Sequence, residues 1–174
     1  MSINLFTDGS VNPKTRVGFG AYMAFSEELE NIEDLSENIK VKKFENTSSS
    51  KLELQTLLWA LSEVSETKII SYTDSQTIVG LLARKQRLQE SAYCSKAGRQ
   101  IRNHELYREF FEYTDKFDIQ FHHIRGHKPL MSRTPLDRFF AFVDKASRKA
   151  LRIYSKNTFK GLAEGNSTDL APQP

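Results

Sequence analysis

Ile3-Asn4-Leu5-Phe6-Thr7-Asp8, followed by Gly9-Ser10, is the stretch of sequence that decides the fold. The alternating side chains of Ile3 and Leu5 predict a β-strand with one buried face, and Phe6 is available to cover the other. Asp8 stands where we expect the strand to end and the backbone to turn. A carboxylate there is costly to desolvate unless a cation meets it. Taken alone, Asp8 is better explained as the start of a turn than as a metal ligand, because a metal site needs partners elsewhere in the chain.

Two further acids follow local patterns of the same kind. Ile69-Ile70-Ser71-Tyr72-Thr73-Asp74 repeats a short apolar strand that ends in Thr-Asp, and a helix is expected next, which Asp74 could cap. The serine run 48–50 introduces a leucine-rich amphipathic helix. We place Glu53 in the first turn of that helix, where a negative charge suits the helix dipole. Each acid therefore has a purely structural explanation as well.

The order of the predicted elements indicates an α/β fold. Three leading strands are joined by short turns, and two later strands are each preceded by helical sequence. We expect a five-stranded mixed sheet, in which a three-strand antiparallel meander is extended by parallel strands and flanked by helices. The sequence predicts strands at 3–8, 18–25, 39–44, 68–73 and 119–124, and helices after 48–50, after 75, over 104–117 and from Thr134-Pro135 onward. We expect one domain over residues 1–155 and a flexible C-terminal tail over 156–174.

Composition excludes several classes of protein. The chain has 174 residues, of which 39% are hydrophobic and 27% charged, which is typical of a soluble globular protein. We see no apolar run long enough to span a bilayer and no signal peptide, so we expect no membrane partner. The single cysteine, Cys94, excludes an internal disulfide framework and fits a reducing compartment, so we expect a cytoplasmic protein. A net charge of +3 permits a polyanionic partner without requiring one.

The predicted sheet offers a way for the acids to meet. If the strands that end in Thr7-Asp8 and Thr73-Asp74 are neighbours, their carboxylates lie close together and repel unless a divalent cation sits between them. Oxygen ligands without clustered Cys or His favour Mg²⁺ or Mn²⁺ over zinc. Glu53 and an acid on the last helix could complete the cluster. Four carboxylates around two metal ions is an arrangement that supports phosphodiester hydrolysis.

Five short motifs occur in order along the chain: Thr7-Asp8-Gly9-Ser10, Lys51-Leu52-Glu53-Leu54, Tyr72-Thr73-Asp74-Ser75-Gln76, Ile124-Arg125-Gly126-His127 and Val143-Asp144-Lys145-Ala146. With these motifs, the chain resembles the type 1 ribonuclease H family, which has the RNase H-like fold. The resemblance extends from Ile3 to about Leu151, and each motif is weak by itself.

The resemblance implies a metal-dependent endoribonuclease that hydrolyses the RNA strand of RNA–DNA hybrids with two Mg²⁺ ions, which Mn²⁺ could replace. It makes Asp8, Glu53, Asp74 and Asp144 the catalytic, metal-binding acids, and His127 a loop histidine that assists proton transfer or product release. The residues matched to substrate contacts are Ser10, Asn12, Ser49, Ser50 and Gln76 in the minor groove of the hybrid, and Arg102 and Asn103 on its DNA strand. We expect a monomer.

The chain departs from the family pattern at two places. Both Asp137 and Asp144 could be the final acid, and we select Asp144 because Asp137 has a local role as the capping-box acid after Thr134. The basic segment from Arg84 to Arg102 lacks the tryptophan-bearing basic handle of some members. Its charges could bind phosphates or form a solvated surface. Weak affinity for hybrids, or dependence on a protein partner, would follow.

The sequence is also compatible with two other functions. One is a nuclease of related fold that acts on DNA, such as a junction resolvase. The other is a non-catalytic module that binds nucleic acid or protein. The presence of all four acids argues against the module, which would have no chemical reason to keep them.

Overall fold

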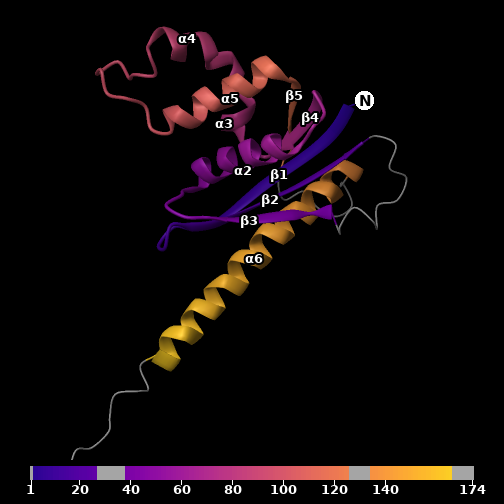
Figure 1. Cartoon of the computed structure of the whole chain (residues 1–174), viewed down its shortest axis with the longest axis vertical. Coiled ribbons are helices and arrows are strands. Elements are labelled where there is room, and N and C mark those ends of the chain that lie inside the picture. The colour runs from indigo at the N-terminus through magenta and orange to yellow at the C-terminus, as the bar shows by residue number, and fades with distance from the viewer. Residues whose placement is uncertain (1, 27–37, 126–133, 166–174) are drawn as a thin grey trace, which may run out of the picture.

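The computed structural model describes residues 2–26, 38–125 and 134–165. Five strands form one mixed sheet in the order β3-β2-β1-β4-β5 (Figure 1). β1, β2 and β3 pair antiparallel, and β4 and β5 run parallel to β1. The strands are β1 (Ser2–Asn12), β2 (Val17–Ser26), β3 (Lys40–Phe44), β4 (Lys68–Thr73) and β5 (Asp118–His123). The predicted fold class is confirmed.

Helices cover both faces of the sheet. α2 and α5 lie on one face, and α6 crosses the other (Figure 1). The helices are α2 (Ser49–Glu63), α3 (Gln76–Val79), the 3₁₀ helix η2 (Leu82–Arg84), α4 (Lys85–Glu90), α5 (His104–Lys116) and α6 (Pro135–Gly165). None of the helices in the described parts of the chain is long and apolar enough to cross a membrane.

The alternation of side chains along β1 builds two separate cores. Ile3 and Leu5 pack with the leucines of α2 and the aromatic residues of α5. Phe6 points to the opposite face, where it stacks on Tyr72 and contacts Val143 and Phe140 of α6 in the second core. This is the period of two that a strand buried on both faces requires.

β1 is longer than the sequence predicts, and the expected turn after Asp8 is wrong. Asp8 pairs with Ala21 in the middle of the strand, and the hairpin turns only after Asn12. Gly9 continues the strand opposite Gly20, because the antiparallel partner satisfies its backbone groups. A Cβ at Gly20 would lie 2.1 Å from the hydroxyl oxygen of Thr56, so this glycine allows α2 to approach the sheet closely.

α6 begins where the sequence predicts and ends later. The backbone N–H of Thr134 donates to Oδ2 of Asp137 at 2.8 Å, and the N–H of Asp137 donates back to the Thr134 hydroxyl at 3.3 Å. This capping box confirms the predicted start. The helix continues to Gly165, so the expected tail at 156–174 begins inside it, and position 155 does not mark a structural boundary. Extending an existing helix costs little, and apolar periodicity is not needed for it.

Candidate active site

Asp8 and Asp74 lie at corresponding positions on two neighbouring parallel strands. Phe6 of β1 is in register with Tyr72 of β4, and each acid comes two residues later in its own chain segment. Asp8 is buried, with 8% of its surface exposed, and Asp74 is half-buried at the end of β4. The two strands are neighbours, as predicted, and the two acids occupy equivalent positions along them.

The carboxyl group of Asp8 is the centre of the site. Its pKa is raised from 3.8 to about 7, mainly by burial and also by the charges of Asp74 and Asp144. Hydrogen bonds from the Ser147 hydroxyl, 2.9 Å from Oδ2, and from the backbone of Gly9 act in the opposite direction. Three acids from β1, the end of β4 and α6 therefore share one electrostatic environment.

Glu53 reaches the same cluster from the other face of the sheet. Burial raises its pKa, the hydrogen bond from Ser75 lowers it, and the charge of Asp74 raises it. α2 begins at Ser49, so Glu53 stands in the second turn and our placement of it in the first turn is wrong. Ser48 occupies the N-cap position but makes no side-chain capping bond. The helix dipole therefore does not account for Glu53, because its effect is confined to the terminal turn.

Asp74 is not a helix cap either. Ser75 is the N-cap of α3, and its hydroxyl accepts the backbone N–H of Ile78 at 3.4 Å. The carbonyl oxygen of Asp74 lies 3.1 Å from Nε2 of His123 on β5. The capping explanation that was open from the sequence is thus removed for this acid.

Asp144 and Asp137 have different surroundings. The charge of Asp144 acts on Asp8, and Oδ1 of Asp144 lies 2.6 Å from Nε of Arg148 one turn later. Oδ2 of Asp137 instead accepts both the backbone N–H and the hydroxyl of Thr134, each at 2.8 Å. Of the two candidates, Asp144 is the one whose charge reaches the buried acid.

The donor set suits a hard divalent cation. Four carboxylates supply oxygen ligands only, and burial together with mutual repulsion raises the pKa of Asp8 and Glu53, a cost that a cation would offset. Within the described residues, no group of three Asp, Glu, His or Cys side chains is close enough to form a preassembled metal site. The acids of this cluster would have to approach one another when an ion binds.

Comparison with known proteins identifies the family. Residues 1–150 match the family model for RNase H. The chain belongs to the RNase H family. It is 25% identical over 145 residues to Ribonuclease H1 of Rattus norvegicus and equally to that of Mus musculus, which covers 79% of this chain and 48% of each relative. The chain thus spans about half the length of the curated relatives it matches.

A solved structure shares the fold of this RNase H family member. The solution structure of the PFV RNase H domain superposes with a TM-score of 0.66 at 15% sequence identity. The match covers 84% of this chain and 92% of that domain. At this identity the likeness concerns the fold alone, and it agrees with the five-stranded mixed sheet described above.

Five of the expected substrate contacts of this RNase H chain are close in sequence to one of the acids. Ser10 and Asn12 follow Asp8 on β1, and Gln76 follows Asp74 at the exposed start of α3. Ser49 and Ser50 are exposed in the first turn of α2. Oδ1 of Asn12 already accepts the backbone N–H of Lys14 at 3.0 Å, which gives Asn12 a structural role in the hairpin turn.

The remaining expected contacts are more distant in sequence. Asn103, in a left-handed conformation with φ 62°, precedes α5 and lines a shallow pocket with Lys51 and Gln55 of α2. Arg102 beside it is exposed. His127 lies outside the described residues.

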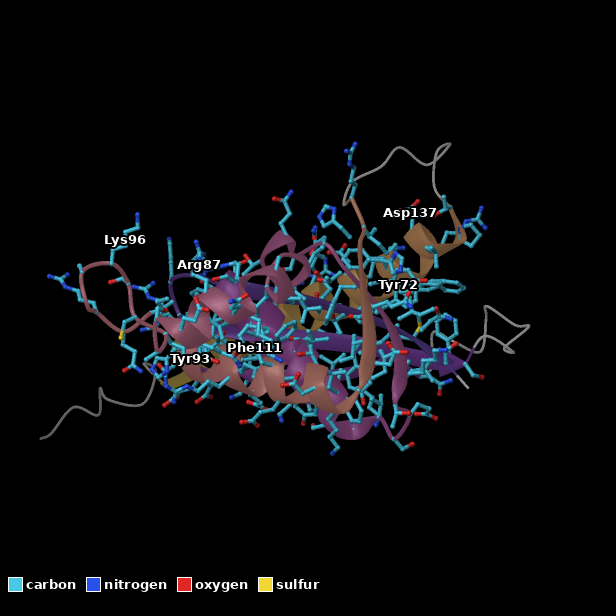
Figure 2. The ribbon with its side chains drawn as sticks, turned by 90° about the horizontal axis from the view of Figure 1, so that it is seen from above. Tyr72, Arg87, Tyr93, Lys96, Phe111 and Asp137 are labelled. Carbon is cyan, nitrogen blue, oxygen red and sulfur yellow. The ribbon has the colours of Figure 1, made fainter. Side chains whose placement is uncertain are left out.

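The basic segment from Arg84 to Arg102 spans η2, α4 and the loop before α5. Lys85 pairs with Asp115 of α5, and the Nε atom of Arg84 is buried without a hydrogen-bond partner among the described residues. Lys96 projects outward from the loop (Figure 2) and is exposed, as is Arg99. Part of this charge is therefore structural, and part faces solvent.

Sequence reasoning missed Ser147. Its side chain is fully buried in α6 and donates to Asp8, 139 positions away in the chain. The Ser147 hydroxyl also lies 3.0 Å from the carbonyl oxygen of Asp144. A serine in an amphipathic helix has no sequence signal for such a role, and only its place three residues after Asp144 hints at it.

Proposed function

We propose that this chain is a metal-dependent endoribonuclease that hydrolyses the RNA strand of RNA–DNA hybrids. The observation that carries the proposal is the environment of Asp8, a buried carboxyl group that shares its surroundings with Asp74 and Asp144. Burying a carboxyl group beside two others costs free energy, and a cation-dependent reaction explains why the fold accepts that cost. Membership of the RNase H family supports the choice of reaction.

Asp8, Glu53, Asp74 and Asp144 would hold two Mg²⁺ ions, which Mn²⁺ could replace. When bound, such ions supply charge stabilisation for the attacking and departing oxygens of a phosphodiester. The chain itself orients the acids. Ser147 donates to Asp8 and thereby favours its ionised form, and Ser75 does the same for Glu53. We infer that His127 assists proton transfer or product release.

Selection of the RNA strand would depend on its 2′-hydroxyl groups, which only RNA carries. Hydroxyl and amide side chains near the acids can both donate to and accept from such groups. We assign minor-groove contacts to Ser10, Asn12, Ser49, Ser50 and Gln76, and contacts with the DNA strand to Arg102 and Asn103.

A substrate panel tests the proposal directly. The chain is incubated with Mg²⁺ and end-labelled RNA–DNA hybrid, duplex DNA, duplex RNA or branched DNA. We expect cleavage of the RNA strand of the hybrid alone. Cleavage of branched DNA would support a junction resolvase instead, and retention of the hybrid without cleavage would support a non-catalytic binding module.

Replacing Asp74 with asparagine tests the site assignment. Asp74→Asn keeps the shape of the side chain and removes one charged ligand, so we expect cleavage to fall by about a hundredfold or more while the chain remains folded. The matched control is Asp118→Asn, which removes an exposed acid at the opposite end of the parallel strands. Initial rates of hybrid cleavage and far-UV circular dichroism are compared for both variants. Unchanged turnover in Asp74→Asn would remove the assignment.

A further inference from the structure

The C-terminal part of α6 carries a basic face that the candidate active site does not use. Six cationic side chains occur within sixteen residues, and all six are exposed. Residues 145–163 contain no Asp or Glu, and the net charge of the whole chain is only +3, so the rest of the chain is acidic overall. The basic face consists of Lys145, Arg148, Lys149, Arg152, Lys156 and Lys160.

The spacing of these residues places them on one side of the helix. Each residue turns the helix by about 100°, so side chains three or four positions apart point in similar directions. Most of the spacings between Lys145 and Lys160 are of this kind. All six lie within an arc of about 120°. The buried residues Val143 and Ser147, and Tyr154 with its contact on Phe19, occupy the other side, which faces the sheet.

Among the described residues, neighbouring acids neutralise little of the positive charge on the basic face. Among the described residues, the one ion pair made by these six cations joins Arg148 to Asp144. Arg152, Lys156 and Lys160 follow one another at intervals of four residues, where like charges repel and destabilise a helix.

The far end of α6 has little support from the rest of the fold. The ring of Tyr154 lies tilted against that of Phe19, with 5.7 Å between the ring centroids, and Lys43 lies over the Tyr154 ring. Beyond this point α6 runs past β3, with no other helix or strand of the described residues beside it (Figure 1). A short helix segment that stands alone and repels itself is only marginally stable in water. An anionic partner along the basic face would relieve that repulsion.

We propose that the basic face of α6 binds the phosphate backbone of the nucleic-acid duplex on one side of the cleavage point. This inference rests on the proposed function, because Asp144, at the head of the face, belongs to the candidate active site. From Asp144 to Lys160 the helix rises about 24 Å, which matches about seven base pairs of duplex. The face would therefore hold duplex outside the catalytic centre and add affinity without sequence preference.

An anionic membrane surface is the other polyanion that a basic helix can meet. A membrane-bound helix needs a continuous apolar strip beside its basic face. Among the described side chains of α6 after Asp144, the exposed large apolar ones are Ile153 and Phe159. They are six residues and about a third of a turn apart, so they form no such strip. The structure therefore favours a nucleic acid.

The test measures binding without cleavage. Fluorescence anisotropy with a labelled RNA–DNA hybrid is recorded in EDTA, at salt concentrations from about 50 to about 200 mM. The full chain is compared with Lys156→Gln/Lys160→Gln, and with the matched control Lys68→Gln/Lys116→Gln, which removes two exposed lysines outside α6. Circular dichroism verifies that each variant folds.

We expect the plot of log affinity against log salt to become less steep by about 2 in the α6 variant, because each lost phosphate contact contributes about 0.9. Over that salt range, the affinity of the unaltered chain should then fall about tenfold more than that of the variant. The control should keep the original slope.

Two outcomes would overturn the proposal. One is an α6 variant whose slope of log affinity against log salt equals that of the unaltered chain. If the unaltered chain still cleaves hybrid with Mg²⁺, the proposed function would then stand without this surface. The other is an unchanged slope together with loss of binding to vesicles of phosphatidylserine and phosphatidylcholine, which would assign the face to membranes. A slope change in a chain that cleaves no substrate would instead contradict the nuclease assignment and support the binding surface.

Discussion

At Asp8, the stability of the fold and the proposed metal binding favour different side chains. Its carboxyl group is buried between β1 and α6, and burial is the main reason that its pKa is raised to about 7. The hydrogen bond from Ser147 partly offsets this effect and keeps the carboxylate oriented. A residue chosen for stability alone would be uncharged at this position.

The first prediction concerns the stability of the metal-free chain against pH. In the unfolded chain Asp8 titrates near 3.8, and in the folded chain near 7. Between these values the folded state holds more protons, so the stabilisation present at low pH is lost as the pH rises through about 7. The full difference corresponds to about 4 kcal/mol as an upper bound. Asp8→Asn should remove this decline and be more stable than the unaltered chain at pH 8.

Urea unfolding in EDTA at pH 5 and pH 8 measures the effect. Asp118→Asn serves as the control, because this exposed acid should leave the pH dependence in place. If Asp8→Asn and the unaltered chain lose the same free energy of unfolding between the two pH values, the buried carboxyl group does not titrate as described.

At the scale of elements, the start of α6 separates a structural acid from a candidate ligand. Asp137 closes the capping box with Thr134, a role that is readable from the sequence because it is local. Asp144 lies two turns further, and its charge acts on Asp8 of β1, on the face of the sheet that α6 covers. The sequence offered both residues for the final acid, since seven positions along a helix return to nearly the same face.

The second prediction contrasts these two acids. Asp137→Asn should lower the free energy of unfolding by about 1 kcal/mol, the usual value of a capping interaction, and leave hybrid cleavage near its original rate. Asp144→Asn should do the reverse, with cleavage lost and stability nearly unchanged. Urea unfolding and initial cleavage rates are measured for both variants. Loss of cleavage in Asp137→Asn, with Asp144→Asn active, would exchange the two roles.

At the scale of the whole molecule, the candidate site exists only in the folded chain. Its acids come from two strands of the sheet, β1 and the end of β4, and from two helices, α2 and α6, which cover opposite faces of the sheet. An ion that binds all of them binds the folded state alone, and folding and metal binding are therefore linked.

The third prediction follows from this linkage. At pH 7.5, Mg²⁺ at a hundred times its dissociation constant should stabilise the chain by about 2.7 kcal/mol, seen as a rise in Tm by scanning calorimetry. Asp74→Asn should lose most of this rise, whereas Asp118→Asn should retain it. An equal rise in all three proteins would place the bound Mg²⁺ outside the acid cluster.

Local patterns in the sequence predicted the sheet, its mixed character and the start of α6. The alternation of Ile3 and Leu5 around β1 and the capping box at Thr134 depend on neighbours in the chain, which the sequence displays directly. The end of β1 could not be predicted in the same way. Glycine is typical of turns, so the sequence predicts a turn at Gly9. In the structure Gly9 pairs with Gly20, the strand continues, and Asp8 lies in the middle of β1.

By itself, the sequence determined which residues could carry the chemistry, because acids that follow strand and helix patterns are visible without coordinates. Only the tertiary structure decided which of them share one environment, that Glu53 lies beyond the first turn of α2, that Asp74 does not cap α3, and that Ser147 supports Asp8. The physical reason is that burial and electrostatic coupling depend on distances through space. Strand pairing and helix packing set those distances between residues far apart in the chain.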